Sequence, residues 1–142
     1  MSFTHAPLTA MQCVVVTPER TFCDRTADFV ALTLYDGEIG IAPGHTPLIG
    51  RLGYGEMRLR EEGQTDRYYI EGGFVEVLDD VVTVLTQRVA PATEIDADVA
   101  REQLRSAQAR RAALPEASAA RDRAIEQARA QLRVAQHGES SL

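Results

Sequence analysis

The sequence predicts an all-β N-terminal sandwich followed by a C-terminal antiparallel hairpin of two helices. Nine of the ten glycines precede residue 74, in a half where short β-branched runs alternate with turn signals. The second half is rich in alanine, the strongest helix former, with thirteen alanines in residues 97–136. We therefore predict a β-sandwich domain over residues 1–90 and a helical hairpin over residues 91–142.

The expected strands recur at about the 8 to 12 residue spacing that is typical of sandwiches and barrels. They cover residues 11–16, 29–34, 55–60, 67–71, 74–78 and 81–86, with a further short strand around Ile39 and Ile41. In residues 55–60, Met57 and Leu59 alternate with charged residues, as in a half-buried strand. Residues 61–64 and 79–80 are expected to form hairpin turns. We expect the strands to make two small antiparallel sheets packed together.

The first helix is expected to begin after Asp96, an N-cap residue, and to end at Pro115. The second is expected to run from near Ser118 to Gly138, so that each helix has about eighteen residues and a length of roughly 27 Å. Their facing stripes are Ala97, Ala100, Leu104, Ala107, Arg111 and Leu114 in the first helix and Ile125, Ala128, Leu132 and Ala135 in the second. A seam made mostly of alanine buries little apolar area, so we expect a marginally stable hairpin that can detach. A helical cap fixed on the sandwich fits the periodicity equally well.

Composition excludes several classes of protein. The net charge of -6, which lies wholly in residues 1–90, argues against a dedicated nucleic-acid binder. No window approaches the roughly 18 apolar residues of a membrane span, and residues 1–10 do not resemble a secretory signal. Two cysteines, Cys13 and Cys23, are too few for a disulfide scaffold, so we expect core thiols in a reducing compartment. The absence of lysine excludes Schiff-base chemistry and a P-loop lysine.

A search for catalytic patterns finds none. His5, His45 and His137 lie far apart, without metal-ligand spacing to cysteine or carboxylate, so we expect no metal site. No serine lies in a G-x-S-x-G motif. An enzyme is therefore the least expected class.

The segment Gly37 to Leu48 reads GEIGIAPGHTPL and lacks the G-K-[ST] ending of a phosphate loop. Here the chain resembles the epsilon subunit of bacterial F-type ATP synthase. Residues 53–58 (GYGEMR) and 69–77 (YIEGGFVEV) match the same family in the same order. Spacing and length agree from about Met11 to Gln136.

The resemblance implies a non-catalytic rotor subunit of the central stalk, which couples ion translocation to ATP synthesis. Its implied partners are the gamma subunit, the c-subunit ring and the alpha/beta catalytic head, where extended helices inhibit ATP hydrolysis. It also implies a peripheral position on the cytoplasmic face of the bacterial inner membrane, with membrane association only through the complex. A thin alanine seam suits such a switch, because its two conformations must lie within a few kcal/mol of each other.

Matched positions carry the expected contacts. Those facing the c ring are Asp36, Gly37, Glu38 and His45, of which Glu38 and His45 are the strongest candidates. Those facing an acidic segment of the beta subunits are Arg121, Arg123, Arg129 and Arg133, since arginine pairs with carboxylates in bidentate fashion. The alternative for these arginines is a solvated helix face.

Some relatives bind ATP between the folded helices, through the pattern I/L-D-x-x-R-A and two arginines of the second helix. Ile95, Asp96, Arg129 and Arg133 match that pattern, but Val99 replaces its arginine. We therefore expect no cofactor, and at most weak ATP binding. The alternative function, a small ATP-sensing β-domain with a helical appendage, depends on this site.

Overall fold

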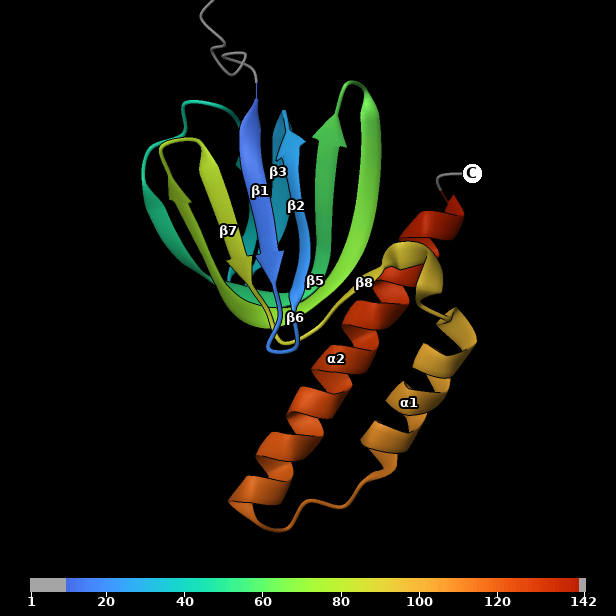
Figure 1. The fold of residues 1–142 in the computed structure, drawn as a ribbon. Helices are drawn as coiled ribbons and strands as arrows, with labels where there is room; N and C mark the ends of the chain where they lie inside the picture. The colour runs from blue at the N-terminus through green and yellow to red at the C-terminus, as the bar shows by residue number, and fades with distance from the viewer. Residues whose placement is uncertain (1–9, 141–142) are drawn as a thin grey trace, which may run out of the picture.

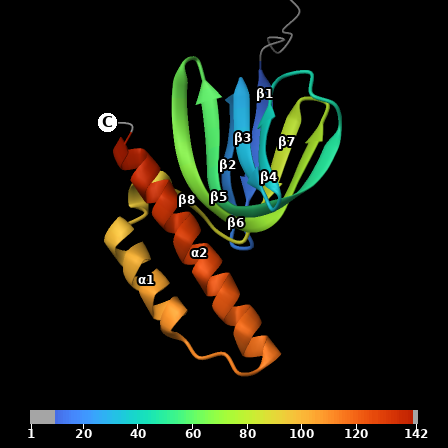
Figure 2. The ribbon, with the colours of Figure 1, turned by 180° about the vertical axis from the view of Figure 1, so that it is seen from behind.

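The computed structural model describes the backbone of residues 10–140 and side chains as far as residue 137, so that His5 lies outside it. The strands are β1 (Met11–Val16), β2 (Thr21–Ala27), β3 (Phe29–Leu34), β4 (Gly37–Ile41), β5 (Leu48–Glu61), β6 (Gln64–Leu78), β7 (Val81–Leu85) and β8 (Val89–Pro91). A short 3-10 helix, η1 (Ala92–Glu94), leads to α1 (Ala97–Ala109) and α2 (Pro115–Ser140). Helix α2 lies between α1 and the β-domain in both ribbon views (Figure 1 and Figure 2).

The eight strands form one hydrogen-bonded sheet in the order β2-β1-β7-β6-β5-β3-β4, with β8 beside β6. The sheet bends over so that its parts face each other as the two layers of a sandwich (Figure 1). The expected sandwich is confirmed, but the expectation of two separate antiparallel sheets is wrong. Strands β5 and β6 have 14 and 15 residues and run through the bend, and β1 pairs with β7 in parallel.

Residues 67–71 and 74–78, expected as two strands, are two parts of the single strand β6, joined by two glycines. Gly72 and Gly73 have φ angles of 63° and 105° and interrupt the regular extended backbone between the two runs. A Cβ atom on Gly73 would lie 1.8 Å from the carbonyl oxygen of Leu85. The strand therefore continues through a kink that only glycine permits.

The main core lies between the two layers. Its largest fully buried members are Leu32, Ile41, Met57, Leu59 and Ile70, together with valines 15, 30, 75, 77, 82 and 84. The alternation expected in residues 55–60 is confirmed, since Met57 and Leu59 have no exposed surface. Glu62, Asp79 and Asp80 have positive φ angles at the tips of the two expected hairpins. Cys13 is also fully buried, and burial raises the pKa of its thiol to about 12.

The helix boundaries differ from those expected. Asp96 caps α1 as predicted, accepting hydrogen bonds from the amides of Asp98 and Val99. However, α1 ends at Ala109, and Pro115 is the first residue of α2 rather than a stop. Proline suits a first helical position because the amide hydrogen that it lacks has no partner there. Helix α2 continues through Gly138, so the helices have 13 and 26 residues instead of about eighteen each.

The seam between the helices is made of alanine, as expected. Ala97, Ala100 and Ala107 of α1 are buried, and so are Ala128 and Ala135 of α2. Arg111 and Leu114 do not belong to the seam, because they lie in the connection after α1 and are exposed. Among the residues described, neither helix has the length and apolar content that a membrane span requires.

Candidate functional site: the docking surface of the helical hairpin

A second, smaller apolar cluster joins α2 to the sandwich. Tyr69 of β6, Ala92 of η1, and Ala130 and Val134 of α2 are buried against one another, with Tyr54 and Ile95 packed at the margin. We call these six residues the docking patch. Because α2 contributes only the small side chains of Ala130 and Val134 to this patch, hydrophobic burial alone holds α2 weakly.

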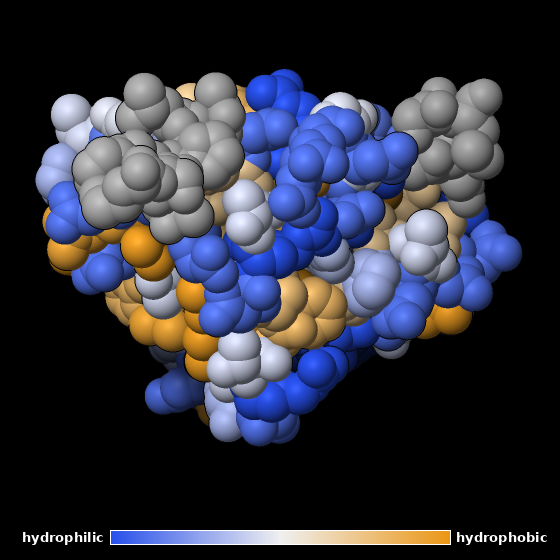
Figure 3. Space-filling model, turned by 45° about the horizontal axis from the view of Figure 1, so that its top comes forward, coloured by the Kyte–Doolittle hydropathy of each residue, from blue (hydrophilic) through white to orange (hydrophobic). Residues whose placement is uncertain are grey.

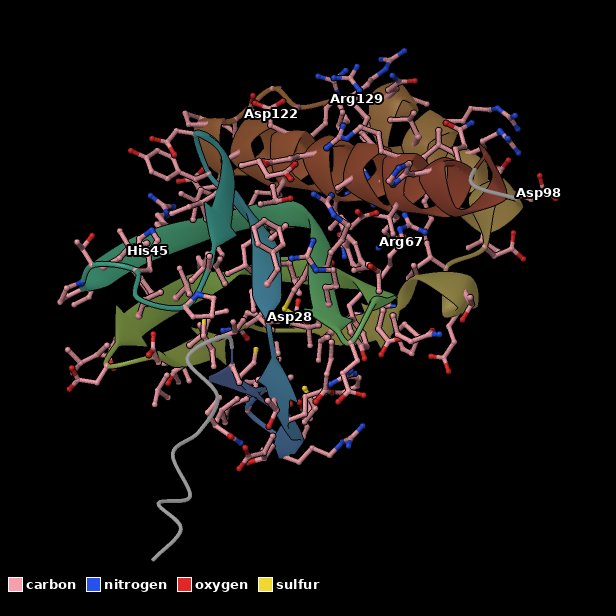
Figure 4. All side chains as sticks on the ribbon, turned by 90° about the horizontal axis from the view of Figure 1, so that it is seen from above. Asp28, His45, Arg67, Asp98, Asp122 and Arg129 are labelled. Atoms are coloured by element: carbon pink, nitrogen blue, oxygen red, sulfur yellow. The ribbon has the colours of Figure 1, made fainter. Side chains whose placement is uncertain are left out.

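Beside the docking patch, Arg67 of β6 connects the sandwich to α2 (Figure 4). Its Nη2 atom donates to the carboxylate of Glu56 on β5 and, at 3.1 Å, to the backbone carbonyl oxygen of Val134. The same atom lies 3.0 Å from Nδ1 of His137. Glu56 also accepts from Arg58 at 2.9 Å and lies 3.0 Å from the His137 ring. This cluster therefore ties two strands to the C-terminal part of α2.

The Glu56 carboxylate is held in its charged form. Its side chain is only 12% exposed, and this burial on its own would raise its pKa. Hydrogen bonds from Arg67, Arg58 and His137 oppose burial and leave the pKa of Glu56 lowered overall. The mostly buried carboxylate of Glu56 is thus paired with Arg58 and Arg67, which both belong to the sandwich.

A second polar contact lies across the docking patch. The side-chain amide of Gln127 on α2 donates to the carboxylate of Glu71 on β6. The same carboxylate accepts from the Tyr69 hydroxyl at 2.8 Å. Burial, and next the charge of Glu71, raise the pKa of Tyr69, so the phenol stays a neutral donor. Helix α2 is therefore held by polar contacts on both sides of a small apolar patch.

Sequence reasoning missed this docking face of α2. Gln127, Ala130, Val134 and His137 follow one another at steps of three, four and three, and so share one face of the helix. The stripe predicted from Ile125, Ala128, Leu132 and Ala135 lies on another face, and its buried alanines belong to the seam with α1. Two of these four residues, Gln127 and His137, are polar. For that reason a search for apolar periodicity does not find this face.

The residues expected to face the c ring are spread along one edge of the sheet. Strand β4 is an edge strand; Asp36 and Gly37 lie at its start, whereas His45 follows its end. Glu38 pairs with Arg58 at 2.7 Å and lines a hollow of about 280 Å³ between the sheet and α2. His45 lies instead in the loop where the amide of Gly44 donates to Asp80 at 2.7 Å. The structure therefore places Glu38 and His45 at opposite ends of β4.

The arginines expected to meet the beta subunits differ in their surroundings. Arg121 donates to the carbonyl oxygen of Gln108 at 3.2 Å and so joins the two helices. Arg123, Arg129 and Arg133 are exposed. Asp122 and Arg129 lie on the side of α2 away from the sheet (Figure 4). Three of the four arginines thus remain open to a partner, and the prediction of that contact stays a prediction.

The four residues matched to a nucleotide pattern have separate roles. Ile95 packs at the margin of the docking patch, and the carboxylate of Asp96 caps α1. Arg129 and Arg133 line a hollow of about 430 Å³ formed with Asp122, Ile125 and Glu126, and Asp96 does not line it. The expectation of no cofactor, and at most weak ATP binding, therefore stays a prediction. Within residues 10–137, no group of three or more histidine, cysteine or acidic side chains could hold a metal ion.

An exposed apolar patch covers part of the sandwich, and sequence reasoning did not find it. Ile49, Phe74, Leu78, Val81 and Leu85 are between 38% and 75% exposed. Phe74 pairs with Leu85 and Leu78 with Val81 across β6 and β7. Hydrophobic side chains gather on the left of Figure 3, the side where β7 and the part of β6 that pairs with it lie in Figure 1. We call these five residues the outer patch, and such a surface is typical of a protein interface.

Comparisons with known proteins agree on one family. Residues 10–92 match the family model described as ATP synthase, Delta/Epsilon chain, beta-sandwich domain. A relative named ATP synthase epsilon chain, from Rhodopirellula baltica, is 49% identical over 124 residues, which are 87% of this chain and 97% of that protein. Another of the same name, from Granulibacter bethesdensis, is 38% identical over 128 residues, covering 87% of this chain and 95% of that protein.

A solved structure supports the fold over most of the chain, including the helices. A chain of the Euglena gracilis mitochondrial ATP synthase, in a structure of its OSCP, F1 and c-ring parts, has a TM-score of 0.83 to this one. The match covers 96% of this chain and 87% of that chain at 23% sequence identity. The likeness includes both helices and not only the β-domain.

Proposed function

The chain belongs to the ATP synthase delta/epsilon family, and on this basis we propose that it is a non-catalytic central-stalk subunit of an F-type ATP synthase. In this role it rotates with the gamma subunit and the c ring and couples ion translocation to ATP synthesis. Its position is peripheral, at the cytoplasmic face of the bacterial inner membrane, and it reaches the membrane only through the complex. The observation that carries the proposal is the 49% identity to an epsilon chain over nearly the full length of both proteins.

The outer patch fits the contact with the gamma subunit. Five apolar side chains clustered on the three paired strands β5, β6 and β7 form a surface whose burial by a partner is favourable. The edge strand β4 fits the contact with the c ring, with Asp36, Gly37 and Glu38 near one end and His45 beyond the other. A test is to replace Glu38 and His45 by alanine, singly and together, in the assembled enzyme. We expect weaker coupling of proton transport to hydrolysis; unchanged coupling with the subunit still bound contradicts this assignment.

The hairpin fits an inhibitor of ATP hydrolysis that acts when α2 leaves the sandwich. Its attachment is small, and Arg123, Arg129 and Arg133 are exposed for an acidic partner in the catalytic head. The test is an enzyme whose subunit is truncated after Ala92. We expect normal assembly and ATP synthesis with increased ATP hydrolysis. Unchanged hydrolysis contradicts the inhibitory role, and failed assembly contradicts docking through the sandwich.

The alternative function, ATP sensing, is tested separately. Calorimetric titration of the whole chain with ATP, with and without magnesium, gives no binding heat up to millimolar concentration if the subunit senses no nucleotide. Saturable heat that disappears in an Arg129→Ala, Arg133→Ala double variant supports the alternative instead.

A further inference from the structure

Helix α2 can leave the sandwich without stranding a buried charge. Glu56 keeps both Arg58 and Arg67 as partners, because all three residues belong to the sandwich. Glu71 keeps the hydroxyl of Tyr69. Breaking a buried pair is strongly unfavourable when it leaves one charge uncompensated, and here release of α2 leaves both carboxylates with partners.

Arg67 joins the two parts directly, because it belongs to the sandwich and binds the backbone of α2. Its Nη2 donates to the carbonyl oxygen of Val134, whatever side chain the helix carries there. Its Nε is buried and, among the residues that the structure describes, has no hydrogen-bond partner. A buried donor without a partner is unfavourable, so Arg67 stabilises the docked hairpin less than a fully paired guanidinium group would.

We propose that Arg67 is a clasp that sets the equilibrium between the docked and the released hairpin. The bond to Val134 favours docking, while the unsatisfied Nε and the persistent pair with Glu56 make release accessible. The clasp rests on the proposed function, in which the released hairpin inhibits hydrolysis. The proposal goes beyond that function by naming Arg67 as the residue that controls how often α2 is released.

The test measures release directly on the whole protein, by the reactivity of a buried thiol. Ala130 is fully buried in the docking patch, so Ala130→Cys creates a thiol that reacts only when α2 is released. Cys23 is only partly buried and is removed by Cys23→Ser. Cys13 is fully buried in the sandwich core and stays as an internal reporter of sandwich unfolding.

In this background Arg67→Gln is expected to raise labelling of the introduced thiol by about tenfold, the effect of losing one charged hydrogen bond. Cys13 should remain protected. The matched control is Arg60→Gln, which removes an arginine that pairs with Asp28 on the sandwich. An equal labelling rate in the Arg67 and Arg60 variants overturns the clasp.

A variant of α2 alone keeps the proposal testable if Arg67→Gln exposes Cys13. His137→Ala removes a ring that contacts both Arg67 and Glu56 and leaves the sandwich sequence intact. We expect it to raise labelling several-fold, and no increase overturns the clasp. Hydrolysis by the assembled enzyme separates the two proposals. If Arg67→Gln increases labelling but leaves hydrolysis unchanged, the clasp stands and the inhibitory function fails.

Discussion

Gln127 of α2 donates its side-chain amide to the carboxylate of Glu71 on β6, which precedes it by 56 positions. The contact joins the helical and β parts of the chain on the side of the docking patch away from Arg67. Because Glu71 also accepts from Tyr69, one carboxylate connects the helix, the sheet and a buried tyrosine of the patch. Docking of α2 therefore depends on polar contacts at two separate places.

Gln127→Ala is expected to favour release of α2. A hydrogen bond to a charged group contributes about 1.5 kcal/mol or more, which predicts about tenfold faster labelling of a thiol introduced by Ala130→Cys. Gln136→Ala, an exposed change on the same helix, is the control and should have no effect. Equal labelling of both variants contradicts a role for the Glu71 contact.

Glu56→Gln is expected to lower stability in a pH-dependent way. The lowered pKa of Glu56 means that folding favours its charged form. Its contribution is complete above the ordinary glutamate pKa of about 4.3 and is lost as the pH falls through the lowered value. Urea unfolding at pH 7 should show a loss of about 1 to 2 kcal/mol, which disappears in strong acid. A loss that is constant with pH refutes this account.

Gly73→Ala is expected to destabilise the sandwich by about 3 kcal/mol or more, because its φ angle and its contact with Leu85 both exclude a side chain. Gly63→Ala is the matched control. Its φ angle is 80°, also positive, but open space surrounds it, so we expect a loss of about 1 to 2 kcal/mol. Denaturant unfolding measures both losses of stability. Equal losses would show that the close contact of Gly73 with Leu85 of β7 is unimportant.

Phe74→Asp is expected to weaken binding of the gamma subunit by at least about tenfold, since burying a phenylalanine contributes about 1.5 to 3 kcal/mol. Phe74 is 55% exposed, so the isolated chain should fold normally. Val99→Asp is a matched control on α1, where Val99 is 51% exposed outside the outer patch. If the two changes weaken binding equally, gamma does not dock on the outer patch.

The sequence predicted most of the fold because its signals there are local. The alternation around Met57 and Leu59 and the alanine-rich seam are read from neighbouring residues, and both are confirmed. The docking contacts could not be predicted in this way, because Arg67 meets Val134 across 67 positions and Gln127 is polar. The outer patch was missed for a similar reason, since its five members form a surface only once β5, β6 and β7 are paired.

Helix α2 is attached to the sandwich by only part of its length. The contacts described above begin at Gln127, so the twelve residues from Pro115 onward project about 18 Å past them (Figure 1). This projecting part moves as a rigid rod when the helix rotates about its first contact, at Gln127. A rotation of about 10° there moves the hairpin tip by about 3 Å, so a force on the tip reaches the attachment as a torque. A partner that binds the tip therefore acts on the contacts that hold the helix without touching them.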